Sequence, residues 1–384
     1  MRIRLLTVFF IGIFLLLPFG LAQTTASLDS IPARMHDVIV ANEVPGAVTV
    51  VATHDSVLRM DAQGWADPEH KSFIRVDSIF WIASMSKPIT ATAVLMLMEE
   101  GKLSLDDPIS KYIPGLSGLK TADGKTQQIT LRHLLTHTSG MGEATDEEAK
   151  AARSLVDLVP AFASKPLAFE PGSQWKYCQS GILTLGRIVE IVSGVPFEVF
   201  VQKRIFDALG MKDTTFYLTE AQMPRWVTPA KREGEQLVSA EIGLLYGHPP
   251  TWREHYPASN GGLFSTAPDY TRFAQMLLSG GVLDGRRYLT AESVRMMSTV
   301  QTGDLVTGFT PGNGWGLGVC IVRQPQGVTA MLSPGTFGHG GAYGTQVWID
   351  RKRDVALIMM IQRSNFKNGD ESPARLAFQK AALE

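Results

Sequence analysis

Strand-like segments near both ends of the chain, separated by a helical middle, constrain the fold more than any other feature. The strand segments are apolar and rich in β-branched residues, and a short charged turn joins the last two. They cover residues 46–52, 57–65, 315–322, 345–349 and 355–362. Helical periodicity covers residues 28–42, 84–101, 181–192, 197–209, 267–278 and 291–297. We therefore predict an α+β fold: an antiparallel sheet formed by both termini and flanked by helices, with a mostly helical insert at roughly 88–310.

The junction between the sheet and the helical insert is where we expect a cleft. The chain passes from the first strands to the insert at Ser84, which precedes the apolar helical pattern. Residues 219–258 are polar and show neither helical nor strand periodicity, which is typical of a long surface segment. We expect this segment to cross over the cleft.

The N-terminal residues have the pattern of an export signal. Arg2 and Arg4 precede a long apolar run, and the small residue Ala22 suits a signal peptidase. We predict a cleaved signal peptide at 1–22, a mature chain of 23–384, and a periplasmic or secreted location. The alternative is an uncleaved membrane anchor, because the apolar run approaches the length of a membrane span.

The charge of the mature chain gives no reason to expect a nucleic acid or an anionic membrane as partner. Loss of Arg2 and Arg4 reduces the 36 basic residues to 34, against 37 acidic ones, so the net charge is −3. Two cysteines, Cys178 and Cys320, are too few for a disulfide framework, although export would permit one bond. Their neighbours favour buried, small apolar side chains.

A Ser-x-x-Lys pattern on a helix places two side chains on one face, one turn apart. The lysine can take the serine proton or hold the site together as a cation, and burial beside a helix N-terminus pushes its ammonium toward the neutral form. The pattern occurs at Ser84–Lys87, Ser117–Lys120, Ser173–Lys176 and Ser364–Lys367. Only Ser84 opens a long apolar helix, with Pro88 in its first turn. This pair is the candidate nucleophile and activator; the alternative is an N-cap serine beside a solvated lysine.

Two other segments carry side chains suited to proton transfer. Tyr177 in FEPGSQWKYCQSG lies at the start of a predicted helix, where nearby cations can lower the pKa of its phenol from about 10. His339 in TFGHGGAYGTQVWID precedes paired glycines at the head of a predicted strand, whose N–H groups can bind an oxyanion. A histidine there can polarise a substrate carbonyl or aid proton transfer. A core tyrosine and a glycine-rich turn with an incidental histidine are the alternatives.

In this order, the three segments resemble the serine β-lactamase and penicillin-binding-protein superfamily, in its branch of class C β-lactamases, D-Ala-D-Ala carboxypeptidases and related esterases. The resemblance extends over almost the whole mature chain, from Val44 to Gln362. It also rests on the segments RHLLTHTSGM, EPGSQWKY, GILTLGRIVEIVSG, ALGMKDT, NGGLFSTAPD and GWGLGV. It implies a β-lactamase/DD-peptidase-like domain over residues 23–384.

The resemblance implies a role for each matching residue. Ser84 would be the nucleophile that forms an acyl-enzyme, with Lys87 as its general base, alone or with Tyr177. Tyr177 would protonate the leaving group and later help to activate the hydrolytic water, although the identity of the base is disputed in related enzymes. The backbone N–H groups of Ser84 and Ala342 would form the oxyanion hole. Losing one such donor typically costs about 3 kcal/mol of barrier.

Two motifs depart from the family pattern, and both bear on the substrate. The usual Tyr-x-Asn is Tyr-Cys-Gln here; Gln179 keeps the amide but carries one more methylene, which leaves its contact with Lys87 and a substrate amide open. The Lys-Thr-Gly of penicillin-recognising members is His-Gly-Gly at 339–341, which loses a cation and a hydroxyl suited to a carboxylate. The His-Gly-Gly form is similar to the esterase and amidase branches. Gln179, Gly340 and Gly341 are the implied substrate-binding residues.

Other mechanisms fit the sequence less well. His133 and His137 have the i, i+4 spacing of zinc peptidases, but Leu134 occupies the place of the general-base glutamate, so structural histidines are the better interpretation. No serine lies in a Gly-x-Ser-x-Gly elbow, which disfavours an α/β-hydrolase. The sequence has neither GxGxxG nor a Walker A motif, so we expect no nucleotide cofactor.

The sequence therefore predicts an exported serine hydrolase that acts through a Ser84 acyl-enzyme on a small-molecule ester, amide or D-amino-acid peptide, without cofactor or metal. The lost carboxylate-binding cation disfavours efficient β-lactam hydrolysis. The alternatives are a D-Ala-D-Ala carboxypeptidase or class C-type β-lactamase, and a non-catalytic binding module. The presence of Ser84, Lys87 and Tyr177 together speaks against the binding module.

Overall fold

The computed structural model describes residues 28–308, 310–366 and 372–384. The predicted signal peptide at 1–22 lies outside these residues, so export stays a prediction. Of the helices that the structure describes, none has the length and apolar character needed to cross a membrane.

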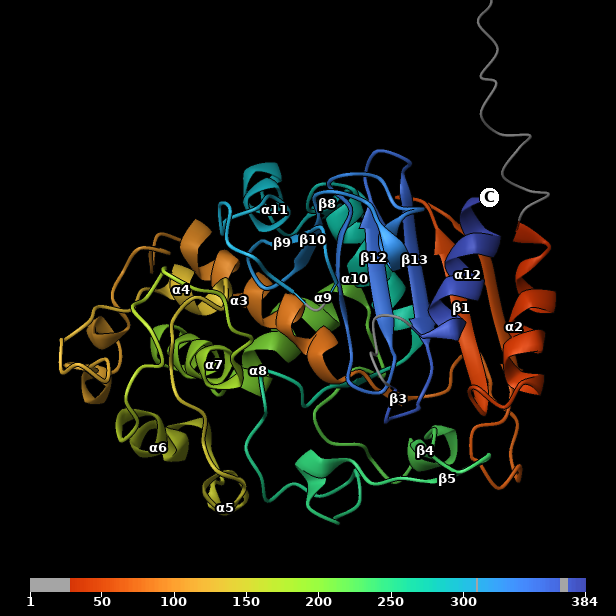
Figure 1. The fold of residues 1–384 in the computed structure, drawn as a ribbon, viewed down its shortest axis with the longest axis horizontal. Helices are drawn as coiled ribbons and strands as arrows, with labels where there is room; N and C mark the ends of the chain where they lie inside the picture. Colours follow the sequence, from red (N-terminus) through yellow and green to blue (C-terminus); the bar gives the residue numbers. More distant parts are fainter. Residues whose placement is uncertain (1–27, 309, 367–371) are drawn as a thin grey trace, which may run out of the picture.

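Both ends of the chain contribute to a seven-stranded antiparallel sheet (Figure 1). Its strand order is β2-β1-β13-β12-β11-β10-β9. The strands are β1 (Gly46–Ala52), β2 (Val57–Gly64), β9 (Asn313–Trp315), β10 (Cys320–Val322), β11 (Phe337–Gly340), β12 (Gln346–Asp350) and β13 (Val355–Met360). β1 pairs with β13, with Val50 opposite Ile358. The predicted α+β fold, with an antiparallel sheet built from both termini, is confirmed.

The C-terminal part of the sheet differs from the prediction at one place. Residues 315–322, predicted as one strand, contribute to two strands, β9 and β10, which pair with each other. The chain reverses between them, and Gly318 takes a φ of 71°, which a side chain would disfavour. The sequence patterns also do not predict β11 or the C-terminal helix α12.

Among the described residues, helices make up most of the remaining regular structure, together with three two-stranded ribbons. The helices are α2 (Ile31–Val40), α3 (Ser86–Glu99), α4 (Leu131–Leu135), α5 (Asp146–Ala151), α6 (Val159–Ala163), α7 (Gln179–Ser193), α8 (Phe197–Val201), α9 (Asp207–Leu209), α10 (Ala267–Leu278), α11 (Ala291–Met297) and α12 (Pro373–Leu383). The ribbons are β3 (Phe80–Trp81) with β6 (Phe264–Ser265), β4 (Ala230–Glu233) with β5 (Gln236–Ser239), and β7 (Val282–Leu283) with β8 (Arg286–Arg287).

Helices cover both faces of the sheet (Figure 1). Successive residues of β1 point to opposite faces, as expected for a strand. Ala47 and Val51 belong to the apolar cluster formed with α2 and α12, which pack against each other. Val48 and Val50 belong to the main core, which includes α10. Burying one such side chain contributes about 1.5–3 kcal/mol, so both helical layers hold the sheet.

Helix α3 joins the sheet to the helical part of the molecule, which lies on the left in Figure 1. Every side chain from Ser86 to Leu97 is buried, because the helix is covered by α7, α8, α11 and β11. The helix begins at Ser86, two residues after its predicted start, since Ala83–Met85 form a 3₁₀ turn. Ser84 therefore lies in the turn that leads into α3, and Met85 is the N-cap.

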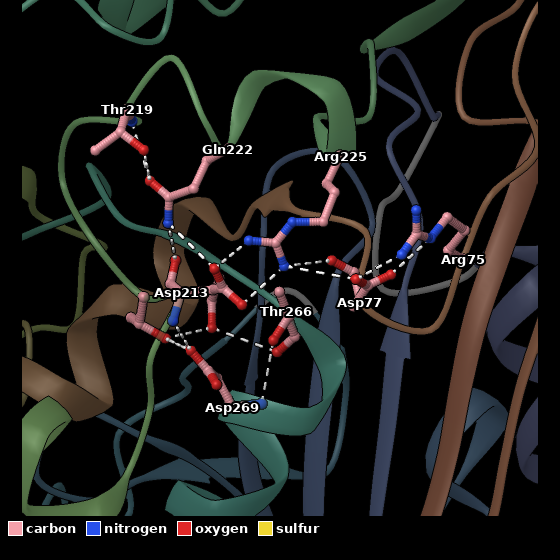
Figure 2. Close-up of polar contacts among 10 residues, drawn as sticks. Arg75, Asp77, Asp213, Thr219, Gln222, Arg225, Thr266 and Asp269 are labelled. Carbon is pink, nitrogen blue, oxygen red and sulfur yellow. Dashed lines mark hydrogen bonds and ion pairs between the residues drawn. The ribbon is translucent and has the colours of Figure 1, made fainter.

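Residues 219–258 leave the helical part and contain the β4–β5 hairpin, which the sequence patterns do not predict. A polar network fixes the start of this segment (Figure 2). Arg225 forms an ion pair with Asp213 and donates to the backbone carbonyl of Asp77 at 3.3 Å. Asp269 in turn accepts the amide of Asp213 at 2.7 Å. The network thus holds the residues that lead into β3, which directly precedes the Ser84 turn.

Candidate active site

The turn that carries Ser84 has an unusual backbone conformation. Ala83 has a φ of 46°, a left-handed conformation that alanine rarely adopts. Ser86 stabilises the turn, since its hydroxyl donates to the carbonyl of Ala83 at 2.7 Å and accepts the amide of Leu263 at 3.2 Å. The turn presents the half-buried Ser84 where the sheet meets the helical part.

Lys87 is fully buried, and acceptors surround its amine. Nζ donates to Ser84 Oγ at 3.0 Å. It also donates to Gln179 Oε1 at 2.9 Å and to the backbone carbonyl of Asn260 at 2.7 Å. Burial is the largest influence on this amine and lowers the pKa of Lys87 to about 7. An amine with this pKa is partly neutral near pH 7, and in that form it can accept the Ser84 proton.

Gln179 reaches Lys87 in spite of its extra methylene, which answers the question that the sequence leaves open. Its Oε1 accepts from Lys87 Nζ and from Asn260 Nδ2, both at 2.9 Å. Asn260 is not among the predicted site residues, although it begins the segment NGGLFSTAPD. Its backbone carbonyl binds Lys87, and a backbone contact leaves no signal in the residue type.

Tyr177 lies between Lys87 and His339. The face of its ring is 4.5 Å from Lys87 Nζ, and its hydroxyl is 3.4 Å from His339 Nε2. His339 Nδ1 lies 2.7 Å from the carbonyl of Gly340, so we assign the ring proton to Nδ1 and an acceptor role to Nε2. Burial and the Lys87 amine lower the pKa of His339 to about 3, so its ring is neutral. In this tautomer Nε2 accepts from the phenol and has no proton with which to polarise a carbonyl.

An aromatic cluster also packs against the Tyr177 ring. The ring of His137 is 4.5 Å from that of Tyr177 and 5.1 Å from that of Trp315. His137 is fully buried, which holds its pKa well below the usual value, and its Nδ1 accepts the amide of Cys178 at 3.1 Å. His133, four residues earlier, accepts the amide of Thr130 at the start of α4. Both histidines therefore have structural contacts.

The His-Gly-Gly segment lies against the Ser84 turn. His339 and Gly340 belong to β11, so the histidine lies within a strand, where the sequence suggested the head of one. The Gly341 amide donates to the carbonyl of Thr345 at 2.7 Å. A Cβ at Gly341 would lie 2.6 Å from the carbonyl of Ile82, two residues before Ser84. Only glycine fits there, and this close approach brings the exposed Ala342 to the same edge of the site.

The two cysteines form no disulfide bond with each other. Cys178 and Cys320 are both buried, as their neighbours in the sequence predict. Burial raises the pKa of the Cys178 thiol to about 11. Cys178 therefore lies beside the site as a neutral thiol.

These features define an α+β protein with a buried Ser-x-x-Lys site. The chain belongs to the Beta-lactamase family, whose model matches residues 31–382. The resemblance that the sequence motifs carry is thus confirmed.

Several relatives match nearly the whole chain. Protein Rv1367c of Mycobacterium tuberculosis is 32% identical over 365 residues, which cover 88% of this chain and 90% of the relative. Esterase EstB of Burkholderia gladioli is 30% identical over an alignment of 397 positions, which covers 94% of this chain and 98% of the relative. The solved structure of EstCE1, described as a hydrolase with promiscuous acyltransferase activity, has a TM-score of 0.84 at 23% identity and covers 94% of this chain and 100% of its own. This last likeness supports the fold.

Proposed function

We propose that this protein is a serine hydrolase that forms an acyl-enzyme at Ser84 with ester or amide substrates that lack a carboxylate beside the scissile bond. One observation carries the proposal: the amine of Lys87 lies 3.0 Å from Ser84 Oγ and is fully buried. Burial keeps this amine neutral in part near pH 7, which a solvated lysine does not achieve.

In the proposed acylation step, neutral Lys87 accepts the proton of Ser84 while Oγ attacks the substrate carbonyl. The negative charge that develops on the carbonyl oxygen is bound by the backbone N–H groups of Ser84 and Ala342. After proton transfer the Lys87 ammonium has three acceptors within reach, including Gln179 Oε1 and the Asn260 carbonyl. These acceptors stabilise the protonated amine inside the site.

Tyr177 is the proposed acid for the leaving group and helps to activate water in deacylation. Its ring lies beside the Lys87 amine, since Nζ is 4.5 Å from the centre of the phenol ring. His339 orients the phenol by accepting its hydrogen bond at Nε2. These steps use side chains and backbone groups of this chain alone.

The neutral ring of His339 favours substrates that place no carboxylate beside it. A neutral ring whose Nε2 accepts from Tyr177 offers no cation and no N–H donor to an anionic group. The lysine of the Lys-Thr-Gly motif supplies such a cation in penicillin-recognising proteins. The name of the 30% identical relative, esterase EstB, agrees with this choice.

The test is a hydrolysis panel of short-chain p-nitrophenyl esters, D-amino-acid amides, D-Ala-D-Ala peptides and nitrocefin. We expect turnover of esters or amides that depends on Ser84, and slow turnover of the two carboxylate-bearing substrates. Nitrocefin or peptide turnover faster than ester turnover would overturn the substrate assignment. Binding of these compounds without turnover, and without covalent labelling by a fluorophosphonate, would instead support a binding module.

Export to the periplasm or the medium is part of the proposal and rests on the apolar N-terminal sequence. The measurement is cell fractionation combined with mass spectrometry of the mature N-terminus. Cleavage after Ala22 is the expected result, and an intact N-terminus in the membrane fraction would show an anchor.

A further inference from the structure

Helix α7 is capped by a residue far away in the chain. Cys178 occupies its N-cap position, and the Cys178 side chain makes no capping hydrogen bond. Glu143 supplies the cap: Oε1 accepts the amide of Gln179 at 2.6 Å, and Oε2 accepts the amide of Ser180 at 2.8 Å. A carboxylate at this place binds N–H groups that have no partner within the helix and interacts favourably with the helix dipole.

Gln179 connects this cap to the candidate base. Glu143 accepts the backbone amide of Gln179. The side-chain Oε1 of Gln179 accepts from Lys87 Nζ and from Asn260 Nδ2. A movement of the first turn of α7 would therefore move an acceptor of the Lys87 amine. A misplacement of about 1 Å in a catalytic constellation can cost about 100-fold in rate.

Glu143 also acts on Lys87 through space. Burial lowers the pKa of Lys87, and the charge of Glu143 is the largest influence that raises it again. Cys178 could act in the same direction only as a thiolate, and its thiol is neutral near pH 7 because burial raises its pKa to about 11.

The two described histidines near the amine carry no charge that could replace Glu143. His339 is neutral, with a pKa of about 3. His137 is neutral as well, because burial holds its pKa well below the usual value. Tyr177 presents the face of its ring to Nζ.

We propose that Glu143 is a positioning residue of this site: its carboxylate fixes the first turn of α7 so that Gln179 meets Lys87, and its negative charge stabilises the protonated amine. The inference rests on the proposed function and goes beyond it, since Glu143 lies outside the three family motifs. It also explains how a fully buried lysine can retain enough basicity to take a serine proton, because a base works best when its pKa lies near the working pH.

The test compares Glu143→Gln, Glu143→Asp and a control, Glu147→Gln. Glu147 is exposed in α5, only four residues away, so its variant removes an equal charge from the same region. The measured quantity is the rate constant for labelling of Ser84 by a fluorophosphonate, followed across the pH range around neutrality. Circular dichroism checks that each variant is folded.

In Glu143→Gln we expect the acid limb of the rate profile to move to lower pH by about half a unit or more, because Lys87 loses a stabilising charge. We also expect the plateau rate to fall about 10-fold, because the cap is weakened. Glu143→Asp keeps the charge and shortens the reach, so its plateau should fall while its acid limb stays in place. Glu147→Gln should match the wild type in both the acid limb and the plateau rate.

An unmoved acid limb in Glu143→Gln overturns the proposal, even if the plateau rate falls. Loss of a purely structural cap would also lower the plateau rate and leave the acid limb in place. An equal displacement in Glu147→Gln also overturns it. Failure of the proposed function is a separate result, since the wild type would then not be labelled at Ser84. In that event the Lys87 amine is titrated by NMR of ¹³C-labelled lysine, and an unchanged titration in Glu143→Gln rejects the proposal.

Discussion

Two Ser-x-x-Lys segments of this chain, Ser84–Lys87 and Ser173–Lys176, have the same spacing and different surroundings. In the first, the lysine is fully buried and its amine donates to the serine hydroxyl. In the second, both residues are exposed in an irregular segment before α7. Ser173 donates to the carbonyl of Glu170 at 2.6 Å, a local turn contact. The motif therefore becomes a candidate nucleophile only where the fold removes water from the amine.

The largest expected difference between the two segments concerns the serines. Ser84→Ala should reduce kcat for any substrate that the wild type hydrolyses by about a million-fold, the loss found when a nucleophile is removed. It should also abolish labelling by a fluorophosphonate. Ser173→Ala should leave both unchanged. Equal effects of the two substitutions would break the comparison, and retained turnover in Ser84→Ala would end the acyl-enzyme proposal.

The lysines should differ by a smaller factor. Lys87→Met replaces the amine with an apolar chain of similar length and should lower kcat by about 10²–10⁴-fold, the contribution of a general base. Lys176→Met removes an exposed charge and should keep wild-type kinetics. Steady-state kinetics at several pH values measure both variants. If the kcat of Lys87→Met were within about threefold of the wild-type value, the proton transfer would belong to another group.

A third test concerns the glycine loop that faces Ser84 and has no counterpart at Ser173. Gly341→Ala places a methyl group within 2.6 Å of the Ile82 carbonyl, so the loop must shift and carry the Ala342 amide with it. We expect kcat to fall about 100-fold, close to the loss of one oxyanion donor. Gly243→Ala is the control, because a Cβ at Gly243 meets open space. If Gly341→Ala reacted at the wild-type rate, the loop would have no part in binding the oxyanion.

The smallest expected effect is the pH dependence. Lys87 acts as a base only when neutral, so kcat/KM should fall about tenfold per pH unit below its pKa of about 7. The same lowered pKa means that the unfolded chain binds this proton more tightly between pH 7 and 10.5, so the free energy of unfolding should rise with pH in that window. Lys176→Met should keep both trends, and Lys87→Met should lose the second. A flat rate profile through pH 7 would contradict the role of Lys87.

Much of the fold could be predicted because its signals are local. The strand over 46–52 and the helices over 267–278 and 291–297 agree with β1, α10 and α11 at every boundary. The strand is a short β-branched apolar run, and each helix has a clear period and a clear end. The predicted strand at 315–322 fails because the chain reverses at Gly318, inside an apolar run. The apolar face of helix α12 consists mostly of alanines, which give a weak signal in the sequence, and the helix is held by packing against α2.

The residues of the candidate site also fall into two groups, those with a local sequence signal and those without one. Ser84, Lys87, Tyr177 and Gln179 can be named from the sequence because their side chains form motifs. Asn260 contributes a carbonyl, which every residue has, and Glu143 is one exposed acid among 37 acidic residues. Only the tertiary fold brings these groups to Lys87, so no local pattern can identify them.

The pairing of β1 with β13 has a consequence for the nascent chain during its synthesis on the ribosome. Ala52 pairs with Ala356, so one side of β1 stays without its partner until about 300 further residues have been made. At about 5–20 residues per second, this delay amounts to roughly 15–60 seconds. During that time an apolar strand edge is open to other chains. We therefore expect the yield of active protein to depend on chaperones that cover the nascent N-terminal hairpin.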